Sequence, residues 1–276
     1  MVKLENLDFK YAKGRPWLFH DLDCELDAGS IVGLLGKNGA GKTTLLKIMV
    51  GLLSPSGGQV EIMGERPFDR CPTFLREVYF LPEEFHIPDV SVQGYVKANA
   101  GFYPRFDIDL LTRLISDFEL PETKSLQKLS YGQKKKFMIS FALSTKCRLL
   151  VLDEPTNGLD IPSKSIFRRV LAGSLDEDQL VIISTHQVHD VERLIDRVLM
   201  LEHGQFIIQK DILDISSKLH FAITTSADGE NILYKEQVPG GYKVIKSETD
   251  GSSAVDVELL FNAISEGNIQ IQEYVK

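Results

Sequence analysis

The residues best suited to chemistry lie in a glycine-rich stretch, GKNGAGKTT, at positions 36–44. The stretch fits the spacing G-x-x-x-x-G-K-[ST], in which successive backbone N–H groups curl around phosphate oxygens and the following helix adds its positive end. Lys42 is then expected to reach the β- and γ-phosphates, and the Thr43 hydroxyl to ligate Mg²⁺. The residues of this stretch that we predict to bind a nucleotide are Gly36, Asn38, Gly39, Ala40, Gly41, Lys42, Thr43 and Thr44.

A phosphate loop of this kind needs a carboxylate on the far side of the metal, and the sequence RLLVLDEP at 148–155 supplies one. Asp153 ends an apolar run and is predicted to hold Mg²⁺, usually through water. Glu154 would lie beside the γ-phosphate and orient or deprotonate the attacking water. A lone Asp-Glu pair where a strand emerges is more often an ordinary surface feature, but the phosphate loop upstream favours the catalytic interpretation.

A histidine ends a second apolar run, LVIIST at 180–185, at a point where a polar side chain can reach the γ-phosphate. A histidine at the end of a strand is more often structural, and it is the position after the phosphate loop and the acids that favours a function here. His186 is therefore predicted to be catalytic, together with Glu154 and Lys42.

The elements that must position these residues are buried strands alternating with helices. Apolar runs predict strands at 31–35, 78–81, 149–152 and 181–184, and periodic segments predict helices at 43–50 and 110–120. This alternation is typical of an α/β fold with a mostly parallel sheet covered on both faces. VKLENLDFKY and LFHDLDCEL, near the N-terminus, instead alternate polar and apolar residues and predict antiparallel strands. Residues 84–128 favour helix and are predicted to form a helical insertion.

The chain changes character after about residue 210. Residues 211–276 carry five Lys or Arg against eleven Asp or Glu, whereas residues 1–210 are close to balance. HFAITT, NILYKEQV, GYKVIKS and IQIQEYV are typical of short strands, PGG at 239–241 of a turn, and residues 255–265 of a helix. We therefore predict a main domain over 1–210 and a small acidic C-terminal α+β appendage over 211–276.

Length, composition and charge exclude several classes of protein. The hydrophobic fraction of 43% and the charged fraction of 25% in 276 residues are those of an ordinary globular protein. The net charge of -8 argues against a nucleic-acid partner, which normally meets a basic face. Cys24, Cys71 and Cys147 share no CxxC spacing and suggest a reducing compartment. We expect no signal peptide and no membrane-spanning segment, so that any membrane role requires a partner.

The order of the motifs along residues 1–210 resembles that of the ATP-binding subunits of ABC transporters. The phosphate loop is followed by LSYGQ at 129–133, similar to the family signature, by LLVLDEP, by NGLD at 157–160, similar to the D-loop, and by His186, similar to the switch histidine. Tyr11 is similar to the aromatic residue that stacks on adenine. The resemblance implies a P-loop NTPase of ABC type, with a mostly parallel sheet core, an N-terminal antiparallel β subdomain and a helical insertion.

The resemblance also implies a composite active site. A helix that begins at the signature presents Ser130, the N–H of Gly132 and its dipole end, which together make an anion site. In the family these groups serve the ATP of a second subunit, so Ser130, Gly132 and Gln133 are predicted to bind a partner's nucleotide in a head-to-tail dimer. Hydrolysis then loosens the dimer. The run KKK at 134–136 is predicted to be a solvated helix face.

Two residues depart from the family pattern. Tyr131 stands where the signature commonly has glycine, and we expect its side chain to point away from the nucleotide. Glu83 stands where the family usually has a glutamine that links the metal site to the helical insertion. Glutamate keeps the metal-binding oxygen while adding a charge, so Thr43, Glu83 and Asp153 are the predicted Mg²⁺ ligands.

The leading hypothesis is an ATP hydrolase that drives a separate integral membrane permease from the cytoplasmic face of the cell membrane. FYPRFD at 102–107 resembles subunits of bacterial exporters, which favours export, while import and the choice between a homodimer and a heterodimer stay open. The alternative is a soluble ABC-type ATPase of translation or DNA repair, but such proteins carry two ATPase halves in one chain or a long coiled coil. A P-loop kinase or GTPase does not explain LSYGQ or His186.

Overall fold

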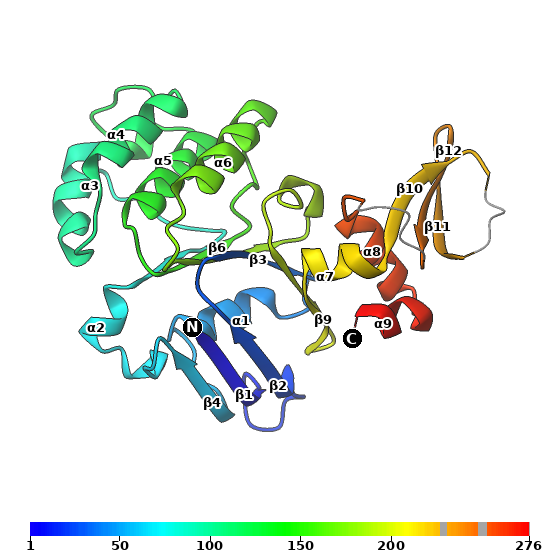
Figure 1. Cartoon of the computed structure of the whole chain (residues 1–276). Coiled ribbons are helices and arrows are strands. Elements are labelled where there is room, and N and C mark those ends of the chain that lie inside the picture. The colour runs from blue at the N-terminus through cyan, green and yellow to red at the C-terminus, as the bar shows by residue number, and fades with distance from the viewer. Residues whose placement is uncertain (227–230, 248–252, 276) are drawn as a thin grey trace.

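A six-stranded sheet forms the centre of the computed structural model, which describes residues 1–226, 231–247 and 253–275 (Figure 1). Its strands, in spatial order, are β5 (Val78–Leu81), β6 (Leu149–Asp153), β7 (Leu180–Thr185), β3 (Ser30–Leu35), β8 (Arg197–Glu202) and β9 (Gln205–Asp211). The first five run parallel, and β9 returns antiparallel to β8. Strands β6 and β7 are buried along their whole length, which explains their unbroken apolar runs. The predicted α/β fold with its mostly parallel sheet is confirmed.

A second sheet, antiparallel as predicted, is built from the N-terminal strands in the order β2-β1-β4. These are β1 (Val2–Phe9), β2 (Phe19–Leu26) and β4 (Gly57–Ile62). Helix α1 (Lys42–Met49) packs with both sheets, because its apolar residues belong to one buried cluster with residues of each. We call this cluster the strand-side core; its members include Leu4, Leu22, Leu26, Val32, Leu34, Leu45, Leu46, Ile48, Val60 and Leu199. The core thereby fixes the phosphate loop, which leads directly into α1.

Four longer helices lie together on the other side of the central sheet (Figure 1). They are α3 (Val92–Asn99), α4 (Ile108–Asp117), α5 (Tyr131–Ser144) and α6 (Ile161–Ser174), and α3 and α4 are the helices predicted for residues 84–128. Shorter turns of helix are η1 (Pro67–Asp69), α2 (Pro72–Leu75), η2 (Ala100–Phe102), η3 (Leu126–Lys128) and η4 (Val188–Asp190). The buried cluster on this side, the helix-side core, includes Leu81, Leu110, Leu114, Phe137, Phe141, Leu152, Phe167, Ile183, Val191 and Val198.

The C-terminal residues form a small α+β arrangement of their own. After α7 (Ile212–Lys218), the strands β10 (His220–Thr224), β11 (Ile232–Val238) and β12 (Gly241–Lys246) pair as an antiparallel sheet in the order β10-β12-β11. The chain continues into α8 (Val257–Ser265) and α9 (Ile269–Val275). The predicted strands over HFAITT, NILYKEQV and GYKVIKS are confirmed, as is the helix before Gly267.

The strand predicted over IQIQEYV is wrong, because residues 269–275 form helix α9. Its buried residues Ile271 and Val275 are four positions apart, a spacing that suits one face of a helix as well as alternate positions of a strand. Asn268 decides between the two, since its side-chain oxygen accepts the backbone N–H of Ile271 as a helix cap does. A seven-residue segment is too short for its periodicity alone to separate these alternatives.

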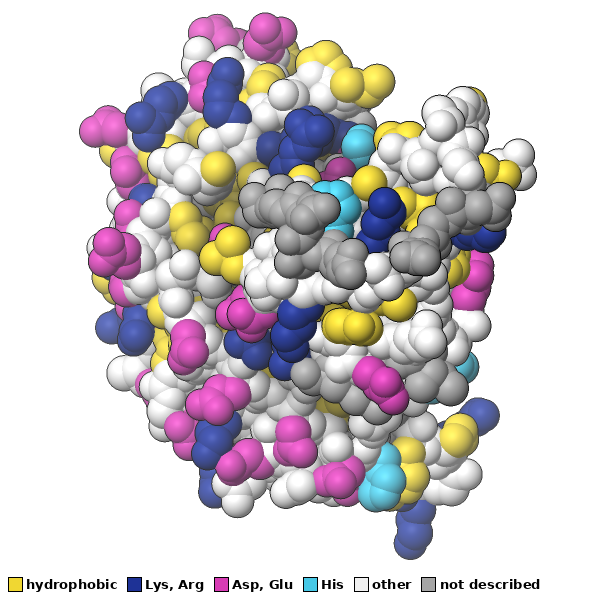
Figure 2. Space-filling view, turned by 45° about the vertical axis from the view of Figure 1, so that its right-hand side comes forward, with side chains coloured by type: hydrophobic (Ala, Val, Ile, Leu, Met, Phe, Trp, Pro, Cys, Tyr) yellow, Lys and Arg dark blue, Asp and Glu magenta, His cyan; other side chains and the backbone are white. Residues whose placement is uncertain are grey.

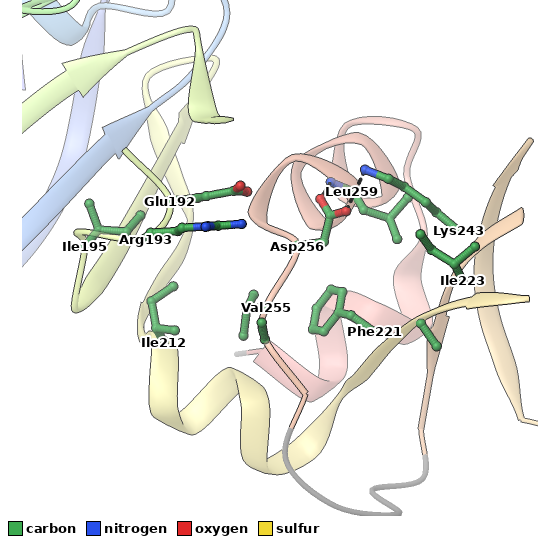
Figure 3. A pocket seen from close by; sticks show the side chains of 12 residues that line it. Glu192, Arg193, Ile195, Ile212, Phe221, Ile223, Lys243, Val255, Asp256 and Leu259 are labelled. Atoms are coloured by element: carbon green, nitrogen blue, oxygen red, sulfur yellow. Dashed lines mark hydrogen bonds and ion pairs between the residues drawn. The ribbon is translucent and has the colours of Figure 1, made fainter. Parts of the chain in front are cut away.

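The C-terminal elements pack on the rest of the chain through the helix-side core. Phe221 and Leu260 belong to the same buried cluster as Val191 and Val198. A cavity of about 520 Å³ remains at this junction, and in Figure 3 Arg193 and Phe221 reach toward it from opposite sides. Because the buried core continues across residue 210, the division of the chain at that position stays a prediction.

The outer surface carries charges of both signs. On the face drawn in Figure 2, Lys and Arg side chains lie among Asp and Glu side chains and scattered hydrophobic ones. Large exposed apolar residues such as Phe102, Ile161 and Leu213 lie on separate elements. Within the described part of the chain, no helix combines the length and the apolar character needed to cross a bilayer.

Candidate nucleotide site

The phosphate loop fills the gap between the end of β3 and the start of α1. Gly39 and Gly41 have φ angles of 84° and 107°, in the left-handed region that favours glycine. A Cβ on Gly36 would lie 2.4 Å from the backbone oxygen of Leu201, so no side chain fits at that position. The two fixed glycines of the motif, Gly36 and Gly41, are thus required by the backbone itself. The first N–H groups of α1 follow directly, and N–H groups in the first turn of a helix have no partner within the helix and suit an anion.

Lys42 is folded back into this loop. Its side chain is buried, and Nζ donates to the backbone oxygen of Gly36 at 2.7 Å. Burial lowers the pKa of Lys42, and the nearby carboxylates of Glu154 and Asp153 oppose that shift. The ammonium group therefore stands between the loop backbone and the acids at the end of β6, where a phosphate group would replace part of its lost hydration.

Two hydroxyl groups meet the carboxylate of Asp153 at the junction of α1 and β6. Thr43 Oγ1 donates to Asp153 Oδ2 at 2.7 Å, and Ser184 Oγ donates to the other carboxylate oxygen of Asp153. Asp153 is 1% exposed, so its direction is fixed by these two hydroxyls. Adjacent hydroxyl and carboxylate oxygens are the hard ligands that Mg²⁺ prefers, and the predicted ligands Thr43 and Asp153 therefore fit this ion.

Glu154 and His186, predicted separately from two strand ends, are in direct contact. Glu154 is 5% exposed, and its Oε1 accepts the backbone N–H of His186 at 3.0 Å and lies 2.7 Å from Nδ1 of the same residue. The φ angle of Glu154 is 46°, in the left-handed region that is uncommon for a residue with a side chain. The carboxylate is thus held in one direction, as a group that receives a proton from water requires.

A cavity of about 420 Å³ connects these groups. Of the predicted residues, those that line it are Tyr11, Asn38, Gly39, Gly41, Lys42, Thr43, Thr44, Glu83, Asp153 and Glu154. The hydroxyl of Tyr11 lies 2.5 Å from Thr44 Oγ1 while 67% of the residue is exposed, so its ring stands at the edge of the cavity. Leu18 also lines the cavity and was not predicted, because a single apolar residue before β2 matches no motif.

Gly36, Ala40, His186 and the signature residues are not among those that line this cavity. Gly36 and Ala40 belong to the phosphate loop itself, and His186 follows β7 in contact with Glu154. The signature instead forms the start of α5, where Ser130 Oγ accepts the backbone N–H of Gln133 at 3.3 Å and the Ser130 N–H donates to Gln133 Oε1 at 3.0 Å. This reciprocal cap fixes the direction of the first turn, which also holds Gly132.

The prediction that KKK at 134–136 is a solvated helix face is wrong for Lys135. This residue is 0% exposed, and its Nζ donates to the backbone oxygen of Glu83 at 3.3 Å. Burial lowers the pKa of Lys135 to about 8, although Glu83 and Asp153 oppose the shift. Lys136 is also largely covered, with Nζ 3.7 Å from Asp160. Helix α5 is enclosed on most sides, so its charged residues must reach partners on other elements.

Glu83 lies in the loop after β5, at the border of the nucleotide cavity. Its Oε1 accepts Nδ2 of Asn157, a residue of the predicted D-loop, at 2.9 Å. Gln187 Nε2 donates to the oxygen of the same asparagine side chain at 3.2 Å. The structure therefore brings the loop after β5, the D-loop and the residue after His186 into one hydrogen-bonded series, which the sequence motifs alone do not indicate.

The phosphate loop and the acids Asp153 and Glu154 lie within a segment that matches a known family. The sequence profile of the family described as "ABC transporter" matches residues 19–157, about half of the chain. The chain belongs to the ABC transporter family. The chain is an ATP-binding subunit of this family and hydrolyses ATP, as the resemblance of its motifs implies.

Relatives of this ABC subunit share most of its length. An uncharacterized ABC transporter ATP-binding protein of Methanocaldococcus jannaschii is 30% identical over 270 residues, covering 95% of both chains. The bacitracin transport ATP-binding protein BcrA of Bacillus licheniformis is 30% identical over 226 residues, covering 78% of this chain and 72% of the relative. A dimeric ATP-binding cassette solved in a post-hydrolysis state with ADP and Pi has the same fold, with a TM-score of 0.67, 23% identity and coverage of 76% and 98%.

Proposed function

We propose that this ABC subunit pairs head to tail with a second ATP-binding subunit around two ATP molecules and thereby drives export through a separate integral membrane permease. The observation that carries the proposal is that the cavity would surround a nucleotide on one side only and leave its other side open to a second chain. Among the described residues that line it, none comes from the signature Leu129–Gln133. The capped start of α5 is an anion site left for the nucleotide of another chain.

Within one chain, different side chains at the cavity bind the phosphates, hold the metal ion and activate the attacking water. Lys42 and the loop amides bind the phosphates, while Thr43, Glu83 and Asp153 offer oxygens to Mg²⁺. The ion, when bound, offsets phosphate charge. Glu154 orients the attacking water and accepts its proton, with its carboxylate held by the end of β7. The ring of Tyr11, at the edge of the cavity, is placed to stack on adenine.

The signature supplies the second set of contacts. Ser130, the N–H of Gly132 and the positive end of α5 would meet the γ-phosphate of the partner's ATP, with Gln133 fixing this turn through the cap. Two chains then contact the γ-phosphate of the same ATP from opposite sides. Hydrolysis splits the γ-phosphate from ATP, and once that phosphate leaves, the charge that both chains contact is lost and the dimer weakens.

The helical insertion offers a surface for the permease. A groove of about 830 Å³ between α3 and α4 is lined by apolar residues that include Val96, Leu111 and Ile115, and its charged lining residues are Lys97, Lys124 and Glu122. An amphipathic helix of a permease, with an acidic edge, fits such a groove. The groove is lined by residues that come after the Glu83 loop in the chain, and we infer that a helix docked there would be coupled to the nucleotide cavity through this segment. The bacitracin relative supports transport, and the site of action would then be the cytoplasmic face of the cell membrane.

The composite site is tested by mixing two inactive variants. Lys42→Ala removes the phosphate-binding cation, and Ser130→Arg places a bulky cation where a partner's γ-phosphate must dock. If sites are shared, an equal mixture regains about a quarter of the wild-type ATPase rate, because half of the dimers are mixed and each has one intact site of two. Ser130→Ala is the control for the loss of the hydroxyl alone. No recovery at any mixing ratio would place each site within one chain.

A further inference from the structure

The loop of Glu83 is held from the signature helix by two side chains. Tyr131 Oη donates to the backbone oxygen of Glu83 at 3.0 Å, and Lys135 Nζ donates to the same oxygen at 3.3 Å. The ring of Phe85 stacks on that of Tyr131, with centroids 5.9 Å apart and planes at 23°. Lys135 Nζ also lies 5.5 Å from the centre of the Phe85 ring. We call these four residues, Glu83, Phe85, Tyr131 and Lys135, the signature clamp.

The D-loop also contacts the signature clamp, through Asn157 and Gly158. Asn157 Nδ2 donates to the Glu83 carboxylate at 2.9 Å. A Cβ on Gly158 would lie 2.7 Å from the Tyr131 ring, and one on Gly132 would lie 2.8 Å from the backbone oxygen of Gly158. The tyrosine ring is therefore packed directly against the D-loop backbone. Its hydroxyl has little freedom to leave the Glu83 loop while the first turn of α5 stays in place.

We propose that Tyr131 and Lys135 are positioning residues, which hold the backbone of Glu83 so that its carboxylate stays at the nucleotide cavity that Asp153 also lines. The inference rests on the proposed function, which gives the Glu83 carboxylate its metal and the signature its second nucleotide. Through the clamp, the position of Glu83 at one nucleotide is tied to the first turn of α5, which serves the other. The tyrosine of the signature thus contacts the backbone of the residue whose carboxylate lines the nucleotide cavity.

The cost of burying Lys135 supports a role beyond packing. A fully covered ammonium group loses its hydration, and a carbonyl oxygen and a ring face replace only part of it. A lysine in such a place lowers the stability of the fold unless its new contacts offset the lost hydration. Its contact here is the same carbonyl oxygen that the Tyr131 hydroxyl binds, so both donors serve the placement of Glu83.

Local proteolysis of the chain without nucleotide tests the clamp directly. A glutamyl endopeptidase cuts after glutamate, and Glu83 and Glu84 lie in the held loop, where both are exposed. Tyr131→Phe removes only the hydroxyl, and we expect cutting there to become about two- to tenfold faster as the loop opens more often. Cutting after exposed Glu122 is the internal standard. Tyr234→Phe, which removes a hydroxyl bonded to Glu236 on β11, is the matched control. Unchanged cutting after Glu83 and Glu84 in Tyr131→Phe would overturn the proposal.

A kinetic cycle tests the consequence for catalysis. Tyr131→Phe should raise the Mg²⁺ concentration needed for half-maximal ATPase activity and lower kcat about two- to tenfold, while ATP affinity measured without Mg²⁺ stays unchanged. In a Glu83→Ala background, Tyr131→Phe should add no further loss, because the carboxylate that it positions is gone. Losses that simply add would contradict the proposal. If faster cutting is found although mixed variants show no shared site, the clamp stands and the proposed dimer fails.

Discussion

Nδ1 of His186 lies 2.7 Å from Oε1 of Glu154, and the backbone N–H of His186 donates to the same carboxylate oxygen at 3.0 Å. The hydroxyl of Thr185 reaches the other oxygen at 3.2 Å. The end of β7 thus supplies three contacts to the carboxylate of Glu154, a residue held in the left-handed backbone region. Two residues that the sequence places 32 positions apart form one hydrogen-bonded unit.

Glu154→Gln should lower ATP turnover by about 100-fold or more, because an amide cannot accept a proton from water. ATP affinity should be preserved, since binding depends on Lys42 and the loop amides. The variant should therefore accumulate as an ATP-bound dimer in size-exclusion chromatography with ATP and Mg²⁺. Lys42→Ala is the contrasting variant, which should weaken ATP binding itself in calorimetry. A Glu154→Gln chain that stays monomeric and releases phosphate at the normal rate would refute the role of Glu154.

Leu260→Ala should lower the free energy of unfolding by about 2–5 kcal/mol, because Leu260 is 0% exposed in the helix-side core. Leu213→Ala is the matched control: Leu213 is 80% exposed, and its loss should change stability by less than about 0.5 kcal/mol. Urea unfolding measures both. ATP affinity of folded Leu260→Ala should stay normal, since the phosphate loop packs on the strand-side core. A loss of stability no larger than that of Leu213→Ala would show that the C-terminal elements do not share the core.

The three cysteines should differ in reactivity. Burial raises the pKa of the Cys24 and Cys147 thiols to about 12, whereas Cys71 is partly exposed. Because the thiolate is the reactive form, a thiol reagent at about pH 8 should label Cys71 alone in the folded chain and all three after unfolding. Peptide mass spectrometry identifies the labelled residues, and fast labelling of Cys147 in the folded chain would contradict the prediction.

The same thiols give a dependence of stability on pH. Between about pH 9 and pH 12 the thiols of the unfolded chain ionise while buried Cys24 and Cys147 stay protonated. The folded state then binds more protons than the unfolded state, so the contribution of these groups to the free energy of unfolding falls as the pH rises. Replacing Cys147 by Ala should make the decrease less steep in urea titrations across this range.

The features that can best be predicted from the sequence are those that depend on a local pattern of residues. The phosphate loop at 36–44 needs a strand before it and a helix after it, and the glycine spacing that reveals it is the spacing that the backbone requires. The strands β6 and β7 are recognisable because each is buried along its whole length. Asp153, Glu154 and His186 follow from the ends of those strands, since parallel strands place their carboxyl ends at one edge of a sheet.

What the sequence did not predict depends on contacts between distant segments. Lys135 belongs to a run of three lysines. Its buried ammonium group is bound by the backbone oxygen of Glu83, a residue 52 positions earlier in the chain. The bond from Asn157 to Glu83 likewise joins residues 74 positions apart. Helix α9 was missed for a different reason, because its few apolar residues suit both periodicities and the cap on Asn268 decides. No local pattern carries such information.

The central sheet stands between two separate buried clusters. The C-terminal elements share the helix-side core with η4 and β8, whereas α1 and the phosphate loop belong with the strand-side core. Substitutions in different clusters have few partners in common, so their effects on stability should be nearly additive. A substitution that loosens the packing of the C-terminal elements should therefore leave the fit of the phosphate loop on its own core largely unchanged.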